Sequence, residues 1–241
     1  MTAGSSGWHA ATVVGTQRLT ETARAITLSA PGVGGALPGQ HIDLRLTAPD
    51  GYQAVRSYSL VATGVDERVD IGVDRVPDGE VSGYLVDDLQ VGDQMEVRGP
   101  LGGYFVWHSD DVAPVLLVAG GSGLAPLLAI LRSRVAAGSA APFRLVYSVR
   151  TPGDVWYPDE LEAAPPGVEV ALLYTRDAPP GWPRPPHRIT AHDLVADGFS
   201  PADRPDVFVC GSTGFVEGAA ALLTGIGHDP ARIKTERFGG A

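Results

Sequence analysis

The chain has one cysteine, Cys210, in 241 residues. A single thiol cannot form a disulfide within the chain, and it cannot supply a cysteine-bound iron–sulfur cluster or a cysteine zinc site. The histidines are scattered as well. Only His187 and His192, with Asp193, lie close enough in sequence to suggest a metal site, and their spacing is poor for one helix face. The proline-rich surroundings favour a solvated loop at these positions, so we expect no metal.

Basic residues are outnumbered, with 18 Lys and Arg against 28 Asp and Glu and a net charge of -10. This balance argues against a nucleic-acid partner, which requires a basic surface. The longest uninterrupted apolar run, Val115 to Ala119, is far shorter than the roughly 20 residues of a membrane span. Met1 to Gly7 is small, polar and uncharged, unlike a secretory leader. We therefore expect a cytoplasmic protein.

The remaining composition is that of an ordinary globular protein, with 44% hydrophobic and 19% charged residues. The 31 glycines and 20 prolines indicate many turns, and 241 residues suffice for one large or two small domains. The sequence pattern changes within residues 107–111. We expect one domain over residues 1–108 and a second over residues 109–241.

The first part shows short segments of alternating hydrophobicity, separated by glycine and proline. Such regular short strands predict an antiparallel β-barrel. The predicted strands are His41–Leu46, Arg56–Val61, Val69–Val73 and Gln94–Arg98.

The second part alternates apolar strands with helical segments, a pattern that predicts a doubly wound parallel α/β sheet. The predicted strands are Val115–Ala119, Phe143–Ser148, Val168–Tyr174 and Asp206–Cys210, and the predicted helices are Leu124–Ala136 and Phe215–Leu223. The proline-rich stretch Ala178–Pro186 reads as a loop.

A glycine loop, Gly120-Gly121-Ser122-Gly123, directly follows the first of these strands and opens the first helix. Free amides at a helix N-terminus, with the helix dipole, favour an anion. The loop differs from the usual dinucleotide fingerprint, since Pro126 stands where its third glycine would be. Strand, loop and helix in this order favour a pyrophosphate site over a plain tight turn.

The segment Arg56-Ser57-Tyr58-Ser59-Leu60 carries side chains that suit a flavin. On a strand, Arg56 and Tyr58 share one face, and Ser57 and Ser59 the other. A guanidinium can bind a phosphate, a phenol ring can lie against a heterocycle and a hydroxyl can bond a ring nitrogen.

A second anion site is expected at Gly79-Glu80-Val81-Ser82. We expect Ser82 to be the N-cap of a short helix that runs to about Leu89. A capped surface helix is the plain alternative. Together with the Arg56 strand, this segment would offer the two anion-binding groups that a flavin dinucleotide needs.

The order of these motifs resembles that of the ferredoxin:NADP reductase superfamily, and most closely the bacterial reductase components of oxygenase systems. The resemblance covers roughly Trp8 to Gly239. It rests on Arg56-Ser57-Tyr58-Ser59, Gly79-Glu80-Val81-Ser82, Gly92-Asp93, Gly99-Pro100-Leu101-Gly102, Gly120-Gly121-Ser122-Gly123, Cys210-Gly211 and Glu236-Arg237-Phe238-Gly239.

The resemblance implies a flavin-binding barrel followed by a nicotinamide-dinucleotide domain, with the flavin ring at their junction. By this likeness Tyr58 would stack on the isoalloxazine and Ser59 would bond near N5. Arg56 would hold the phosphates, and Val81 with Ser82 would support the pyrophosphate.

The likeness also places Cys210 near the nicotinamide and Glu236 beside the flavin. Phe238 would either cover the free face of the flavin or plug the barrel. From the residues alone, Cys210 could equally be a buried apolar residue and Glu236 a surface charge. Both readings stay open.

The cofactors expected are FAD and NADPH, or NADH in place of NADPH. Relatives that bind FMN tend to lack a well-formed Gly-x-Val-Ser element, which this chain has. Thr175-Arg176 matches the region where relatives that use NADP carry a hydroxyl and an arginine, although Asp177 has the wrong charge and Arg150 is a rival.

The expected activity is that of an NAD(P)H oxidoreductase that passes single electrons to a separate acceptor such as a ferredoxin or haem protein, since no iron–sulfur or globin domain is visible. Residues 1–108 carry a net charge of 7 − 13 = −6 and residues 109–241 of 11 − 15 = −4, so an acidic partner would need a local arginine patch. The alternatives are a non-catalytic redox-sensing subunit and a free flavin or ferric reductase.

Overall fold

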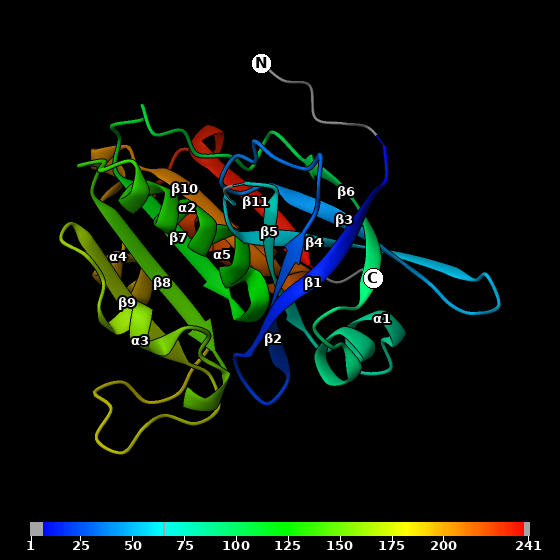
Figure 1. The fold of residues 1–241 in the computed structure, drawn as a ribbon. Helices are drawn as coiled ribbons and strands as arrows, with labels where there is room; N and C mark the ends of the chain where they lie inside the picture. Colours follow the sequence, from blue (N-terminus) through cyan, green and yellow to red (C-terminus); the bar gives the residue numbers. More distant parts are fainter. Residues whose placement is uncertain (1–6, 65, 239–241) are drawn as a thin grey trace. The chain divides into compact units, whose positions relative to one another are not determined.

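A computed structural model of the protein describes residues 7–64 and 66–238. The chain divides into two compact units (Figure 1). One contains the residues up to His108 with Leu128–Ser133, and the other contains Ser109–Leu127 and the residues from Arg134 onward.

The first unit is a closed antiparallel barrel in which the strands pair in the order β1-β2-β5-β4-β3-β6, with β6 returning to β1 (Figure 1). The strands are β1 (His9–Arg18), β2 (Ala23–Ser29), β3 (His41–Thr47), β4 (Gln53–Ala62), β5 (Arg68–Asp74) and β6 (Gln94–Leu101). Between β5 and β6 lies α1 (Glu80–Gly83), which continues as a π-helical turn, Tyr84–Asp88.

The barrel core explains why four of these strands were predictable. Alternate residues such as Ile42 and Leu44 of β3, and Ile71 and Val73 of β5, are fully buried. The four predicted strands are confirmed within β3, β4, β5 and β6. Strands β1 and β2 have no counterpart among the predictions. In β1 the register shifts between Val13 and Gly15, which breaks the two-residue period.

The second unit has a parallel five-stranded sheet in the order β11-β10-β7-β8-β9. The strands are β7 (Val115–Gly120), β8 (Phe143–Val149), β9 (Val168–Tyr174), β10 (Asp206–Ser212) and β11 (Ile233–Phe238). The helices are α3 (Pro158–Glu162), α4 (Ala191–Asp197) and α5 (Thr213–Gly225), together with α2 (Leu124–Ala136), of which Leu128–Ser133 are grouped with the first unit. Every strand and helix predicted for this part is confirmed, within two residues at each end.

The apolar strands of this sheet are buried as expected for a parallel sheet covered by helices. Leu116 and Val118 of β7 and Val209 of β10 are fully buried in one cluster with Val216 and Leu223 of α5. No helix among the described residues is long and apolar enough to cross a membrane.

Candidate functional site

The segment that carries Arg56 to Leu60 lies within β4, between β3 and β5. Arg56 is exposed, and its Nη1 donates to the carbonyl of Val55 at 2.8 Å. Arg45, Arg68 and Arg98 of the barrel each pair with a carboxylate. Arg56 makes no such pair among the described residues, so its charge is available to an anion.

Tyr58 is half-buried and packs against the barrel core, whereas Ser59 is only 3% exposed. Burial raises the pKa of Tyr58 to about 12, and the nearby Arg56 charge opposes part of this rise. The phenol is therefore neutral at physiological pH. Leu60, next in the strand, is a buried member of the same core.

Ser57 is held by a network that the sequence did not reveal. Its hydroxyl donates to Oδ1 of Asp43 at 2.7 Å, and Arg98 donates to the other oxygen of the same carboxylate. Asp43 on β3 is paired in register with Ser57 on one side and with Arg98 on the other. The network thus ties three adjacent strands together beside the Arg56 segment.

The expected role of Ser82 as an N-cap is wrong. The N-cap of α1 is Gly79, without a side-chain hydrogen bond, and the helix begins at Glu80. Ser82 lies within the first turn, where its Oγ accepts from the amide of Val76 at 3.1 Å and donates to the carbonyl of Gly79 at 3.4 Å. A Cβ at Gly79 would lie 2.6 Å from this Oγ, so the close approach of Ser82 favours a glycine at position 79.

Arg24 of β2, like Asp43 of β3, was not among the residues predicted from the sequence. Its guanidinium donates to the carbonyls of Leu85, Val86 and Leu89 at 3.4, 3.3 and 2.8 Å, so it caps the end of the helical segment that begins with α1. Arg24 thereby fixes the segment that carries Val81 and Ser82. No local signal in the sequence links it to residues some sixty positions away.

In the second unit, the predicted residues gather at one edge of the sheet. The strands are parallel, so their carboxyl ends lie together. β8 and β9 extend the sheet on one side of β7, and β10 and β11 on the other. The strand order therefore reverses between β7 and β10, which is where open α/β sheets bind ligands. Gly121–Gly123 follows β7, and Cys210-Gly211 lies near the end of β10.

Close packing explains the glycines at this point. A Cβ at Gly123 would lie 2.2 Å from the Cys210 carbonyl oxygen, and one at Gly211 would lie 2.8 Å from the Phe215 ring. Gly121 has a φ of +54°, and a Cβ there would meet open space. The loop, with Ser122 at its centre, is packed against β10 at Gly123 and open at Gly121. An anion fits such a loop.

Cys210 and Glu236 are register partners on β10 and β11, and Phe238 pairs with Ser212 in the same way. Cys210 is fully buried, whereas Glu236 and Phe238 are partly exposed. Burial, followed by the charge of Glu236, raises the pKa of the Cys210 thiol well above its ordinary value, against a hydrogen bond with the Gly211 backbone. Gly239, the last residue of the terminal motif, lies outside the described residues.

Thr175 and Arg176 follow β9 at the same edge of the sheet. The amide of Thr175 donates to the carbonyl of Val149, and the amide of Arg176 to that of Arg150, both at 2.9 Å. Arg176 and Arg150 are both exposed, so two cations lie at the ends of neighbouring strands. Either guanidinium can pair with an anion at this edge of the sheet.

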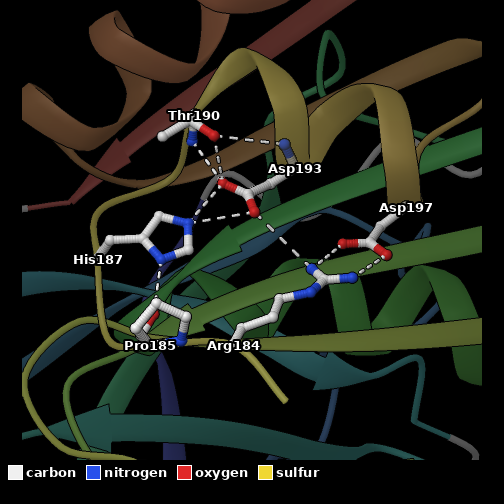
Figure 2. A network of polar contacts seen from close by, with 6 residues as sticks. All are labelled: Arg184, Pro185, His187, Thr190, Asp193 and Asp197. Carbon is white, nitrogen blue, oxygen red and sulfur yellow. Dashed lines mark hydrogen bonds and ion pairs between the residues drawn. The ribbon is translucent and has the colours of Figure 1, made fainter.

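The expectation of a solvated loop around His187, His192 and Asp193 is wrong in part. His192 and Asp193 belong to α4, and Asp193 is only 2% exposed. Its carboxylate accepts from the amide and hydroxyl of Thr190 and contacts the ring of His187 (Figure 2). The proline-rich stretch before it is a loop, as predicted.

Both parts of the chain match oxidoreductase families. Residues 11–106 match the model of the oxidoreductase FAD-binding domain, and residues 117–221 match that of the oxidoreductase NAD-binding domain. The barrel and the sheet hold residues that fit these groups. The barrel has an arginine with no carboxylate partner among the described residues beside a neutral tyrosine, and the sheet has an open glycine loop at its switch point.

Curated relatives are reductase components of oxygenase systems. The reductase component of propane 2-monooxygenase from Rhodococcus jostii is 29% identical over 207 residues, which is 83% of this chain and 55% of the relative. The ferredoxin–NAD(P)(+) reductase component of the naphthalene 1,2-dioxygenase/salicylate 5-hydroxylase systems of Ralstonia is 30% identical over 205 residues, which is 83% of this chain and 60% of the relative. The chain thus spans 55% to 60% of the length of these two relatives.

Solved structures share the fold. The FAD/NAD-binding domain of the Vibrio cholerae nitric oxide dioxygenase has a TM-score of 0.84 and 24% identity, and the match covers 96% of this chain and 99% of that one. The Amycolatopsis cytochrome P450 reductase GcoB has a TM-score of 0.83 and 28% identity, with 96% and 70% covered. The chain therefore belongs to the oxidoreductases that join an FAD-binding domain to an NAD-binding domain.

Proposed function

We propose that the protein is an FAD-dependent reductase that takes hydride from NADPH, with NADH less favoured, at flavin N5 and passes single electrons to a separate protein acceptor. The observation that carries the proposal is the presence in one chain of the Arg56–Ser59 strand and of a glycine loop at a topological switch point. The curated relatives are reductase components of oxygenase systems, which supports this activity. A cytoplasmic location is part of the proposal.

The barrel would bind the flavin dinucleotide. Arg56, which has no carboxylate partner among the described residues, would bind its phosphates, and Val81 with Ser82 would support the pyrophosphate. The neutral ring of Tyr58 would lie against the isoalloxazine, and Ser59 would hydrogen-bond it near N5. Asp43 and Arg24 would hold β4 and α1 in position for these contacts.

The parallel sheet would bind the nicotinamide nucleotide at its carboxyl edge. The amides of Gly121–Gly123 would receive the pyrophosphate, and Thr175 with Arg176 would bind the 2'-phosphate. Cys210, Gly211 and Glu236 would lie on the nicotinamide side, at the ends of β10 and β11. Phe238 would shield the flavin from water.

The bound flavin supplies the chemistry, because it accepts two electrons as hydride and releases them one at a time. The chain contributes alignment, through rigid strands, and exclusion of water. The high thiol pKa keeps Cys210 protonated and uncharged, so it would not act as a nucleophile.

Anaerobic stopped-flow absorbance tests the proposal. When the purified holoprotein is mixed with NADPH, its flavin absorbance is expected to fall within the time of one catalytic turnover. Absence of bleaching within minutes would contradict a reductase and favour the redox-sensing subunit. Extraction of the flavin and comparison with FAD and FMN standards identifies the cofactor.

Flavin binding is tested with Tyr58→Ala and Tyr58→Phe. The alanine variant is expected to bind FAD roughly tenfold more weakly, because the loss of one stacked ring costs about 1 to 1.5 kcal/mol of binding free energy. The phenylalanine variant keeps the ring and should keep most of the affinity. Tyr52→Ala is the matched control, because Tyr52 lies just before β4 and is 60% exposed. Equal affinities for all variants would place the flavin elsewhere.

The acceptor is tested through ionic strength. In the barrel, the guanidinium carbons of Arg45 and Arg98 lie 4.2 and 5.0 Å from the centroid of the Trp8 ring, yet each arginine is paired with a carboxylate. A rate of electron transfer to an acidic ferredoxin that falls steeply with salt would support docking on a local arginine patch. A rate that rises with salt would indicate net repulsion, and with it a neutral or basic partner, such as a haem protein.

A further inference from the structure

The loop between β9 and α4 is fixed to α4 by two basic side chains, Arg184 and His187 (Figure 2). Their partners are Asp197 and Asp193, which are four residues apart on α4 and so lie on the same face of the helix. Arg184 forms a two-point contact with the Asp197 carboxylate, and its Nη1 lies 3.8 Å from Oδ1 of Asp193. The loop is thereby attached to α4 at two positions.

The contacts of the His187 ring require its charged form. Nδ1 lies 2.7 Å from the carbonyl oxygen of Pro185, and Nε2 lies 3.0 and 3.2 Å from the two carboxylate oxygens of Asp193. A carbonyl and an ionised carboxylate are acceptors only, so both ring nitrogens must donate. Only the imidazolium carries two N–H groups. The neutral ring would lose one of the two contacts.

Asp193 is a fixed partner for this cation. It is 2% exposed, and its Oδ2 also accepts from the amide and hydroxyl of Thr190 at 2.8 and 2.6 Å. These hydrogen bonds and the contact with His187 lower the pKa of the carboxyl despite its burial, which alone would raise it. The carboxylate therefore stays ionised and in place while the histidine titrates.

The His187 contact closes the loop that carries Arg176. The amide of His187 donates to the carbonyl of Tyr174, the last residue of β9, at 2.9 Å. Within the loop, Trp182 packs edge-on against Tyr174 with ring centroids 5.1 Å apart. Residues 175–186 thus leave β9 and return beside its last residue, and Arg176 lies in the first leg of the loop.

We propose that His187 is a positioning residue: as an imidazolium it holds the loop of residues 175–186 on α4, and the loop loosens when His187 loses its proton. Arg176 is then less well placed for the 2'-phosphate of a nucleotide. This last consequence rests on the proposed function, whereas the closure of the loop does not.

The charged groups around His187 determine the pH at which this happens. The Pro185 carbonyl and then the Asp193 carboxylate raise the pKa of His187, while Arg184 opposes them. A raised pKa means that the contact is complete below about pH 6.5, the ordinary value for histidine, and is lost as pH rises through the higher folded-state value.

Hydrogen exchange of the loop tests the closure without any nucleotide. We compare His187→Gln with the wild type at the same pH, for peptides within residues 177–186. At pH 6 the variant is expected to exchange roughly three- to fivefold faster, the effect of one half-exposed ion pair. At pH 8.5 the two proteins should converge, because the wild type has lost the proton. His192→Gln is the matched control, since His192 is exposed on the adjacent helix position.

Equal exchange of His187→Gln and wild type at pH 6 would overturn the proposal. So would a difference that stays the same at pH 8.5, because it would mark a structural role independent of titration. Faster exchange in His192→Gln as well would show that any histidine of this region has the effect, which also contradicts the assignment.

Binding of NADP⁺, measured by calorimetry, tests the consequence for the nucleotide. The 2'-phosphate itself titrates near pH 6, so the ratio of variant to wild-type affinity is compared at each pH. His187→Gln is expected to weaken binding about threefold at pH 6 and not at pH 8.5. If Arg176→Ala weakens binding and His187→Gln does not, the positioning role is wrong. If neither does while the exchange result holds, the loop closure stands and the assignment of the 2'-phosphate to Arg176 fails.

Discussion

Cys210 and Glu236 lie in register on the parallel neighbours β10 and β11, which places a buried thiol beside a carboxylate. Burial and the carboxylate charge both disfavour the thiolate, so the thiol pKa is raised well above its ordinary value. A lone cysteine of the chain is thereby kept unreactive at the edge of the sheet where we place the nicotinamide.

Alkylation of Cys210 measures this effect. We expect the native protein to react with iodoacetamide far more slowly than the unfolded chain at pH 8, and to stay slow at pH 9. Glu236→Gln removes one of the two causes, so its native rate should rise at the same pH. A native rate equal to that of the unfolded chain would contradict the raised pKa.

Replacement of Arg176 tests whether this residue distinguishes NADPH from NADH. Arg176→Ala is expected to raise KM for NADPH by roughly tenfold or more, the loss of one charge-assisted hydrogen bond, and to leave KM for NADH unchanged. Arg150→Ala is the control, because Arg150 lies on the neighbouring strand end. A larger effect of Arg150→Ala would transfer the role to that residue. Equal kcat/KM for NADPH and NADH in the wild type would overturn the preference.

The Asp43 carboxylate stabilises the barrel beside the flavin-binding strand. It is 8% exposed, and the hydrogen bonds from Ser57 and Arg98 lower its pKa against the opposing effect of burial. Asp43→Ala should therefore cost about 2 to 3 kcal/mol of unfolding free energy, less than a fully buried pair because Arg98 is partly exposed.

Denaturant unfolding of Asp43→Ala and of Asp87→Ala tests this prediction. Asp87 pairs with Arg75 at 3.3 Å on the surface of the barrel, and its loss should cost less than about 1 kcal/mol. The lowered pKa of Asp43 means that its contribution is complete above its ordinary pKa and is lost as pH falls through the folded-state value. Equal losses in both variants would contradict a special role for Asp43.

Tyr58 makes the barrel sensitive to high pH. Its pKa of about 12 in the fold lies above the ordinary value of 10, so the folded state holds a proton that the unfolded chain releases. Stability is complete below pH 10 and falls by about 2 to 3 kcal/mol as pH rises to 12. Tyr58→Phe should abolish this part of the decline in denaturant unfolding of the flavin-free protein. An unchanged decline in that variant would show that other tyrosines cause it.

His228 makes the parallel domain sensitive to low pH. It is 3% exposed, its Nε2 has no hydrogen-bond partner among the described residues, and burial lowers its pKa. The fold favours the neutral ring, so the contribution of His228 to the unfolding free energy is fully present above pH 6.5. Below that pH the unfolding free energy falls, by about 1.4 kcal/mol for each unit by which the fold lowers the pKa of His228. In the His228→Phe variant the unfolding free energy should depend less on pH between pH 7 and 5 than in the wild type. The His192→Gln variant should keep the pH dependence of the wild type. A variant as pH-sensitive as the wild type would exclude His228 as the cause.

Much of the fold was predictable because its signals are local. Four barrel strands show two-residue alternation, and all predicted elements of the parallel sheet carry long apolar runs or helical spacing. Strand β1 could not be found in this way, because a register shift between Val13 and Gly15 interrupts its period. The resemblance to the superfamily, confirmed by both domain matches, rested on motif order rather than on any single motif.

The sequence suggests candidate site residues only where they follow one another in the chain. Ser82 was expected to cap a helix, but its hydroxyl accepts a hydrogen bond from the loop before α1 and the N-cap is Gly79. Arg24 and Asp43 were absent from the predicted site, since their partners are brought to them by strand pairing.

The sequence by itself determined the two types of domain, their order and the segments that suit a flavin and a pyrophosphate, because alternation, glycine loops and motif order are properties of neighbouring residues. Only the tertiary structure decided that Asp193 is buried and holds His187, and that Cys210 faces Glu236. Burial, charge pairing and pKa depend on residues distant in the chain, and these come together only when the sheet and its loops pack.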